Sequence, residues 1–198
     1  MLPDNKFIFM DSEFGGIGMQ YSLLSFCFII TDNKFNILDE LNLFLKPNDC
    51  VYHVCGEAMN VNKINLIDHD KIALTYKEGG TKLYNFINTH SNFGALKLIP
   101  VGHGFSEDLL QLFDKLMNRK TWEAHVSYRR LDTSVTLQFL KICGIFPETV
   151  SGSLSSLIEY FKIPIDGELH SARTDTLCTI KVLQKMVELV VDKNIKVV

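Results

Sequence analysis

An α/β domain, built from a mixed sheet with helices on its faces, is the fold class that the sequence predicts. Three segments near the start have the apolar patterns of strands and are joined by short turns, which indicates a meander. Beyond residue 79, short apolar stretches alternate with longer stretches of helical periodicity. No internal repeat or linker interrupts this order, so we expect residues 1–198 to form one domain.

Composition and charge narrow the class of protein. Hydrophobic residues make up 46% and charged residues 22% of the chain, which is typical of a soluble globular protein. The formal net charge of −3 argues against a domain that grips a long stretch of nucleic acid by charge alone, because such domains are usually basic. An enzyme that holds only a few nucleotides is not excluded. We interpret the local basic residues as scattered surface charge: Lys115, Arg119, Lys120, Arg129, Arg130 and Arg173.

The sequence predicts an intracellular, cytoplasmic protein. No run approaches the length of about 20 apolar residues that a membrane span requires, and the first residues lack the apolar core of a signal peptide. The cysteines are odd in number, 5, and we expect most of them to be reduced, buried thiols.

The meander is predicted from three segments. Residues 7–10 are a short apolar run, 22–31 are almost entirely apolar and aromatic, and 35–45 alternate large apolar with polar residues. A continuous apolar run indicates a strand buried on both faces, whereas alternation indicates a half-exposed antiparallel partner. Residues 48–78 suggest only short helical turns.

Helices and short strands follow. We expect a helix from Gly79 with Thr81 as a possible N-cap, a strand over 97–101, and a helix that begins near Phe105. A strand over 126–131 should end at Asp132, which caps a helix over 133–143. Two more helices are predicted, over 154–161 with Ser153 as its cap, and from about 172 to the end.

Two carboxylates follow the first strand. Asp11 and Glu13 are two residues apart, so on an extended backbone both side chains point to the same side. Adjacent carboxylates repel each other and stay ionised together most easily around a hard divalent cation. The alternative is a simple polar strand end, because the same spacing recurs at Asp166 and Glu168.

Two later segments supply possible partners. Asp108 falls within or beside the apolar stripe of its helix, where a carboxylate is costly unless it is paired or bound to a metal. An Asp in a first helical turn is also favoured by the helix dipole, which does not explain an inward direction. His170 and Asp175 lie at the entry to the last helix.

Taken in order, these residues resemble the DEDDh family of 3′–5′ exonucleases, which includes the proofreading subunits of bacterial replicative polymerases. The three family motifs are similar to residues 9–15, 101–108 and 170–175, and the resemblance covers almost the whole chain. It implies a ribonuclease H-like fold, with a mixed sheet of about five strands whose second strand is antiparallel to its neighbours. Two departures are that Phe14 replaces a common threonine and that Gly104 replaces an asparagine.

The resemblance implies a metal-dependent 3′–5′ exonuclease that releases nucleoside 5′-monophosphates. Asp11, Glu13, Asp108 and Asp175 would be the ligands of two divalent cations, Mg²⁺ or Mn²⁺, and His170 would be the general base. The expected partner is the 3′ end of DNA or RNA, with single strands favoured, and no membrane is expected.

Substrate contacts are expected at the turn after Glu13. Phe14, Gly15 and Ile17 would lie against the terminal nucleotide, unless the glycines serve only to shape the turn. Phe105 could stack as well, although its spacing favours core packing, and His103 is expected to be structural. Two alternatives stay open: a non-catalytic nucleic-acid-binding module on the same fold, and a phosphodiesterase specific for RNA or short oligonucleotides.

Overall fold

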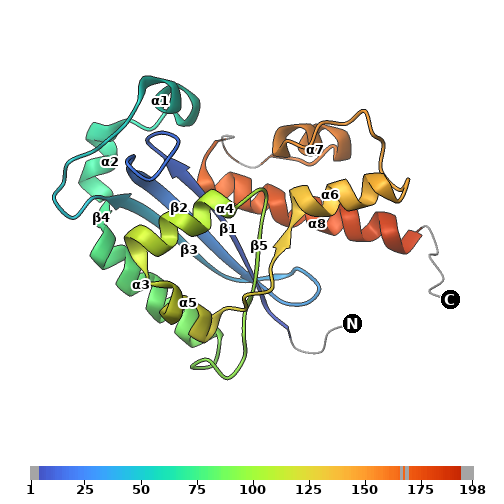
Figure 1. Cartoon of the computed structure of the whole chain (residues 1–198), viewed down its shortest axis with the longest axis horizontal. Helices are drawn as coiled ribbons and strands as arrows, with labels where there is room; N and C mark the ends of the chain where they lie inside the picture. The colour runs from blue at the N-terminus through green and yellow to red at the C-terminus, as the bar shows by residue number, and fades with distance from the viewer. Residues whose placement is uncertain (1–4, 166, 168–169, 193–198) are drawn as a thin grey trace.

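A computed structural model describes residues 5–165, 167 and 170–192 of the chain. Its centre is a mixed six-stranded sheet in the order β4-β3-β2-β1-β5-β6, with helices on both faces (Figure 1). The predicted α/β class is therefore confirmed. The expected number of about five strands is too low by one, because the two-residue strand β4 pairs with the end of β3.

The predicted meander is present. β1 (Phe7–Phe14), β2 (Leu23–Thr31) and β3 (Ile37–Lys46) are consecutive antiparallel neighbours. Every residue of β2 is buried, as its continuous apolar sequence predicts for a strand covered on both faces. β1 extends beyond the expected 7–10, and the acidic pair therefore lies within the strand, paired with β2.

The other strands are short and parallel to their neighbours. β4 (Leu74–Thr75) pairs with β3, β5 (Ile99–Gly102) pairs with β1, and β6 (Leu131–Asp132) pairs with β5. The predicted strand over 126–131 was wrong in extent. Only an isolated bridge joins Val126 to Leu98 before the chain leaves the sheet and returns at β6.

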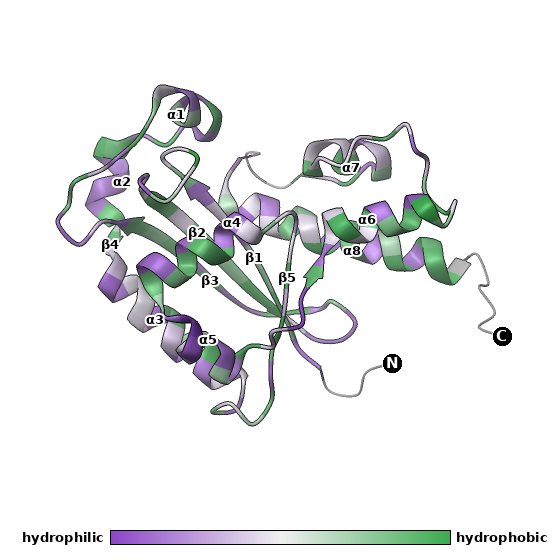
Figure 2. Cartoon of the chain, in the orientation of Figure 1, coloured by the Kyte–Doolittle hydropathy of each residue, from purple (hydrophilic) through white to green (hydrophobic). Residues whose placement is uncertain are grey.

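Each face of the sheet has its own helices, because side chains alternate between the faces along β1. Phe7 and Phe9 pack against α8 (Ala172–Asp192) on one face. Ile8 and Met10 belong to the core of the other face, which residues of α3 (Tyr76–His90) and α5 (Arg119–His125) complete. Figure 2 shows the central strands as mostly hydrophobic, in keeping with burial on both faces.

Shorter helices complete the fold. α4 (Ser106–Gln111) follows β5 and continues into the π-helical turn η1 (Leu112–Leu116). α6 (Thr133–Ile142) and α7 (Leu154–Phe161) pack with α8 around a second apolar cluster. The predicted N-caps Asp132 and Ser153 are confirmed, because each side chain accepts hydrogen bonds from amides in the first turn of its helix.

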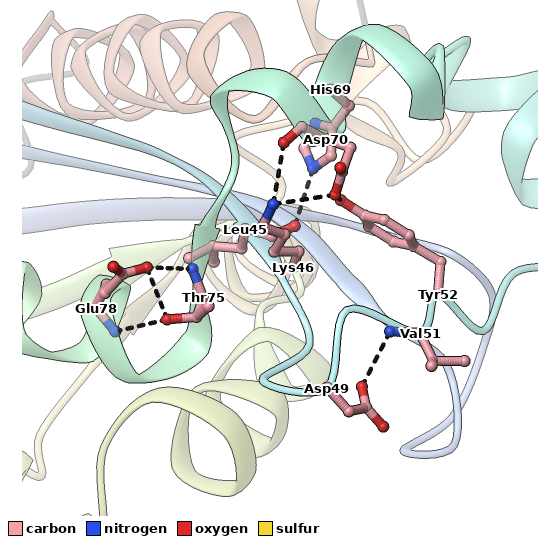
Figure 3. Close-up of polar contacts among 9 residues, drawn as sticks. All are labelled: Leu45, Lys46, Asp49, Val51, Tyr52, His69, Asp70, Thr75 and Glu78. Atoms are coloured by element: carbon pink, nitrogen blue, oxygen red, sulfur yellow. Dashed lines mark hydrogen bonds and ion pairs between the residues drawn. The ribbon is translucent and has the colours of Figure 1, made fainter.

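The predicted start of the third helix was wrong. α3 begins at Tyr76 rather than at Gly79, and its N-cap is Thr75 rather than Thr81. Thr75 and Glu78 form a reciprocal capping box, in which each side chain accepts a hydrogen bond from the other residue's backbone amide (Figure 3). Thr81 instead donates from its hydroxyl to the carbonyl of Lys77 inside the helix.

The segment between β3 and β4 forms α1 (Gly56–Asn62) and α2 (Leu66–Ile72). Figure 3 shows how α2 is fixed to the end of β3: Lys46 Nζ lies 3.1 Å from Asp70 Oδ1, and His69 Nε2 lies 2.9 Å from the carbonyl of Leu45. Tyr52 also donates to Asp70. These contacts fix α2 to the end of β3 and to the connection between β3 and α1, and α1 lines a cavity beside the acidic cluster.

The expectation that most of the cysteines are buried is wrong: Cys27 and Cys178 are buried thiols, whereas Cys50 and Cys143 are exposed and Cys55 is half-buried. Within the described ranges, every helix is too short or too polar to span a lipid bilayer.

Candidate functional site

The pleat of β1 places Asp11 and Glu13 on one side of the sheet. Both residues follow the alternation of Phe7 and Phe9, so they face α8, and both are half-buried. β2 fixes their backbone, since Asp11 pairs with Cys27 and Glu13 with Ser25. The expectation that the two carboxylates share one side is therefore confirmed, on a strand with a neighbour on each side.

Asp175 joins this pair from the first turn of α8. Carboxylate oxygens of Asp11, Glu13 and Asp175 all lie within 4.8 Å of one another. Asp175 Oδ1 is buried and has no hydrogen-bond partner in the described part of the chain. A buried oxygen without a donor is costly and calls for a cation or an ordered water.

Asp108 approaches from the opposite side of β1. It lies in α4, is 8% exposed, and accepts a hydrogen bond of 2.5 Å from the hydroxyl of Ser12. It is not one of the three carboxylates within 4.8 Å of one another, but its charge acts on two of them. The inward direction that its helical spacing predicts is confirmed.

The four carboxyl groups oppose one another's ionisation. Burial first, and then the charges of Asp108, Asp175 and Glu13, raise the pKa of Asp11 well above its ordinary value. Burial, then Asp175 and Asp108, raises the pKa of Glu13 to about 8. Burial also raises the pKa of Asp108 to about 6, against the lowering effect of the Ser12 hydrogen bond, and raises that of Asp175.

These residues fit a site for divalent cations. Their ligands are all carboxylate oxygens, which hard ions such as Mg²⁺ and Mn²⁺ prefer. A bound cation would stabilise all four as carboxylates, which burial and mutual repulsion otherwise disfavour. The buried, unpartnered oxygen of Asp175 fits a cation as its ligand, as it would an ordered water.

His170 precedes α8 and is exposed, with a left-handed backbone conformation at φ 62°. It is close enough to Asp175 for its charge, and for a hydrogen bond from its backbone amide, to lower the pKa of that carboxyl. The structure thus places this histidine beside the acidic cluster. Asp166 and Glu168, the second pair with the same spacing as Asp11 and Glu13, lie outside the described residues.

An apolar cavity of about 320 Å³ opens beside Glu13. The turn after β1 forms one wall, where Ile17 is 93% exposed. Gly15 is required at the base of this turn, because a Cβ there would come within 2.6 Å of the carbonyl of His53. Other residues lining the cavity are Phe14, Gly16, Cys55, Glu57, Ala58, Val61 and Asn62.

The wall from α1 was not predicted. Ala58 and Val61 are three residues apart, and so share one face of a helix, but both look like ordinary packing residues in the sequence. The nearest signal is the apolar pattern around Ala58. Asn62 joins the two walls, since its amide donates to the carbonyl of Phe14 at 3.0 Å.

Two side chains from the far side hold the turn in place. Gln111, which is fully buried, donates from Nε2 to the carbonyl of Gly18 at 3.1 Å. Lys115 donates from Nζ to the carbonyl of Met19 at 3.1 Å. Lys115 lies in the π-helical turn, a type of distortion that is common at functional sites. The helix that carries Asp108 therefore also positions the turn that carries Ile17.

Two other predicted residues have structural surroundings. Phe105 is 1% exposed and packs in the core, which agrees with the role that its spacing favours. His103 Nε2 donates to the carbonyl of Gly152 at 3.0 Å, and its Nδ1 lies 2.8 Å from the hydroxyl of Thr133. Burial lowers the pKa of His103 and favours the neutral ring. His103 is structural, as expected.

The mixed sheet with helices on both faces has the fold of several solved exonuclease I structures. E. coli exonuclease I in complex with a dT13 oligonucleotide is similar over 96% of this chain, with a TM-score of 0.76 and 16% identity. Exonuclease I from Methylocaldum szegediense is similar over 97%, with a TM-score of 0.69 and 20% identity. A zinc-bound form of an E. coli exonuclease I–single-stranded DNA complex is similar over 91%, with a TM-score of 0.72 and 18% identity.

This chain covers only 43%, 41% and 40% of those three exonuclease I chains, respectively. The likeness therefore establishes the fold, and it concerns less than half of each neighbour. No family model and no curated protein sequence matches the chain.

Proposed function

We propose that this chain is a metal-dependent 3′–5′ exonuclease that releases nucleoside 5′-monophosphates from nucleic-acid 3′ ends. The observation that carries the proposal is the meeting of Asp11, Glu13 and Asp175 within 4.8 Å, with Asp108 beside them. This cluster lies in a fold whose solved neighbours are exonuclease I structures, including complexes with dT13 and dA16 oligonucleotides. We therefore favour single-stranded DNA as the substrate, with RNA as the competing choice.

The four carboxylates would hold two Mg²⁺ or Mn²⁺ ions. Two such ions activate a water molecule and stabilise the leaving oxygen during phosphodiester hydrolysis. Asp11 and Glu13 lie on a strand with a neighbour on each side, so they would provide the fixed half of the site. Asp108 and Asp175 approach from helices on opposite sides and would complete it.

His170 would act as general base. An imidazole ring is the side chain that most often serves as a general base in enzymes. Its exposed position beside Asp175 supports this role, because the side chain is available to an incoming water molecule. The proton would move from the attacking water to a ring nitrogen of His170 as the phosphodiester bond breaks.

The terminal nucleotide would lie in the 320 Å³ cavity beside Glu13. Its walls are apolar and include Phe14 and Ile17, which would contact the base or the sugar. Gly15 would let the backbone of the turn approach closely. Phe105, which is buried, would support the structure beneath α4 rather than meet the nucleotide.

The deciding experiment is a substrate panel of single- and double-stranded DNA and RNA, with dinucleotides, in Mg²⁺ and in Mn²⁺. We expect single nucleotides with a 5′-phosphate from the wild type, and none from Asp11→Asn or His170→Ala. Asp39→Asn, an exposed aspartate on β3, is the matched control for the first variant and should retain activity.

Unchanged hydrolysis in both site variants would overturn the proposal. Tight binding of oligonucleotides without hydrolysis in either metal would indicate a binding module instead. Hydrolysis confined to dinucleotides or very short RNA would indicate a short-oligonucleotide phosphodiesterase.

A further inference from the structure

A second hollow borders a different face of α4. Two cavities of about 450 and 630 Å³ adjoin there, since both are lined by Glu123, Ser127 and Tyr128. Leu109 of α4 lines the first, whereas the adjacent Asp108 contacts Ser12 and the acidic cluster. We call this hollow the 119–130 groove, because α5 and the connection from α5 to β6 form most of its wall.

The groove is basic in a chain whose net charge is negative. Its charged lining residues are Lys97, Arg119, Arg129 and Arg130 against the single carboxylate of Glu123. Arg119 neutralises Glu123 through an ion pair of 3.0 Å. Arg129 and Arg130 are both exposed, and neither forms an ion pair within the described part of the chain. Two positive charges are therefore left at the rim.

An aromatic ring lies beside these charges. Tyr128 is 75% exposed and borders both cavities. The guanidinium of Arg129 lies 5.3 Å from the centre of its ring. Further in, the first cavity is lined by apolar side chains that include Trp122 and Phe113. Guanidinium groups beside an exposed ring are the combination by which proteins hold a phosphate and stack on the attached base.

We infer that the 119–130 groove binds single-stranded nucleic acid a few nucleotides upstream of the 3′ end that the acidic cluster holds. Arg129 and Arg130 contact backbone phosphates, and Tyr128 stacks on a base. This inference rests on the proposed function for the direction of the strand. It adds a second contact surface that makes the affinity depend on the length of the strand.

The geometry makes such a strand short. A helix with its side chains is about 10 Å across, and α4 borders the acidic cluster through Asp108 and the groove through Leu109. A strand that begins at the cluster therefore reaches the groove after a few nucleotides, whereas a dinucleotide does not. A loss of affinity that is seen with long strands but not with a dinucleotide can therefore be assigned to the groove rather than to the terminal-nucleotide cavity.

The test measures KM and kcat for 5′-labelled oligothymidylates of two and sixteen nucleotides. The variants are Arg129→Ala/Arg130→Ala and Tyr128→Ala, with Lys34→Ala/Lys82→Ala as a control that removes the same charge from exposed sites elsewhere. We expect KM for the 16-mer to rise about tenfold in the double-arginine variant and at least fivefold in Tyr128→Ala. We expect kcat, and KM for the dinucleotide, to stay within twofold.

Salt provides a second readout, because each phosphate contact on a single strand adds about 0.7 to the slope of log affinity against log salt. Binding of the 16-mer in EDTA, followed by fluorescence anisotropy, should lose about 1.4 from this slope when both arginines are replaced. This measurement holds even if the wild type hydrolyses nothing, so failure of the proposed function and failure of the groove are distinguishable. An unchanged 16-mer KM and slope, or an equal change in the control, overturns the inference.

Discussion

Ser12 donates a hydrogen bond of 2.5 Å to Asp108, although 96 residues separate them along the chain. Ser12 lies between Asp11 and Glu13 in β1, but it points to the other side of the sheet because side chains alternate. β1 thus presents the carboxylates of Asp11 and Glu13 on one side of the sheet. On the other side, the Ser12 between them binds Asp108. The bond ties α4 to the end of β1 and fixes the position of a proposed metal ligand.

Replacing this hydroxyl should damage both stability and activity. In Ser12→Ala, Asp108 loses its donor while it remains buried, so the free energy of unfolding should fall by about 1–3 kcal/mol. We expect metal-dependent hydrolysis to fall at least tenfold. Urea denaturation and a nuclease assay measure the two effects. Ser155→Ala, at an exposed position of α7, should change neither, and an active Ser12→Ala would show that Asp108 needs no anchor.

The metal-free protein should become less stable as the pH rises. Its folded state holds protons on Glu13 up to a pKa of about 8 and on Asp108 up to about 6, whereas the unfolded chain releases them near the ordinary values of 4.5 and 3.8. The folded state therefore binds more protons between about pH 4 and 8, and the free energy of unfolding falls across this range.

The free energy of unfolding should fall by at most about 1.4 kcal/mol per pH unit for each extra proton that the folded state binds. Urea titrations in EDTA at pH 5, 6, 7 and 8 measure it. Glu13→Gln, which cannot ionise, should flatten the slope. If the wild type and the variant have the same slope, Glu13 is not buried among like charges as described.

Divalent cations should restore the stability that the metal-free protein loses as the pH rises. A cation bound by the four carboxylates stabilises only the folded state, by about 2.7 kcal/mol at a concentration one hundred times the dissociation constant. We expect Mn²⁺ or Mg²⁺ to raise the melting temperature, and to raise it more at pH 8 than at pH 5. Calorimetry in Mn²⁺ and in EDTA measures the difference. Asp175→Asn should abolish the rise, and a rise that persists would place the bound ion elsewhere.

The cavity beside Glu13 can be filled without touching a proposed metal ligand. In Ala58→Trp, the larger side chain would occupy much of the 320 Å³, so KM should rise at least tenfold while the Mn²⁺-induced rise in melting temperature is retained. Kinetics on a short oligonucleotide and calorimetry measure the two effects. Ala95→Trp makes the same substitution in an exposed loop and should leave KM unchanged. Normal kinetics in Ala58→Trp would exclude this cavity as the nucleotide site.

Gln111 should act on the substrate through the turn that it holds. In Gln111→Ala, the carbonyl of Gly18 loses its donor, and we expect faster amide hydrogen exchange over residues 17–20 and a severalfold higher KM. Gln138→Ala, at an exposed position of α6, is the matched control. Exchange at the wild-type rate would show that Lys115 alone fixes the turn.

The spacing of apolar residues in the sequence correctly predicted which side chains are buried within a single strand or helix. The apolar run of β2 and the inward side of Asp108 are both properties of local spacing. The start of α3 failed because Gly79 and Gly80 look like helix breakers in the sequence. In the structure they lie inside the helix and allow close packing: a Cβ on Gly80 would come within 2.2 Å of the carbonyl of Leu116.

Features that depend on distant partners could not be predicted in this way. The wall that α1 contributes to the cavity is joined to the turn after β1 by the hydrogen bond from Asn62 to the carbonyl of Phe14, across 48 residues of sequence, which no local pattern reveals. That Asp11, Glu13, Asp108 and Asp175 share one site was predicted only from the resemblance of their motifs to a known family. The hydrogen bond from Ser12 and the anchoring of the turn by Gln111 emerged only from the packed structure.

The order of the carboxylates along the chain has a consequence for synthesis. The meander that contains Asp11 and Glu13 forms from neighbouring segments, which is the kind of contact that folds early. Asp175 belongs to the last helix of the described chain and packs on β1 and β2 from far along the sequence. In a nascent chain the proposed metal site therefore stays incomplete until α8 has been synthesised and has docked on the sheet, and hydrolytic activity would begin only then.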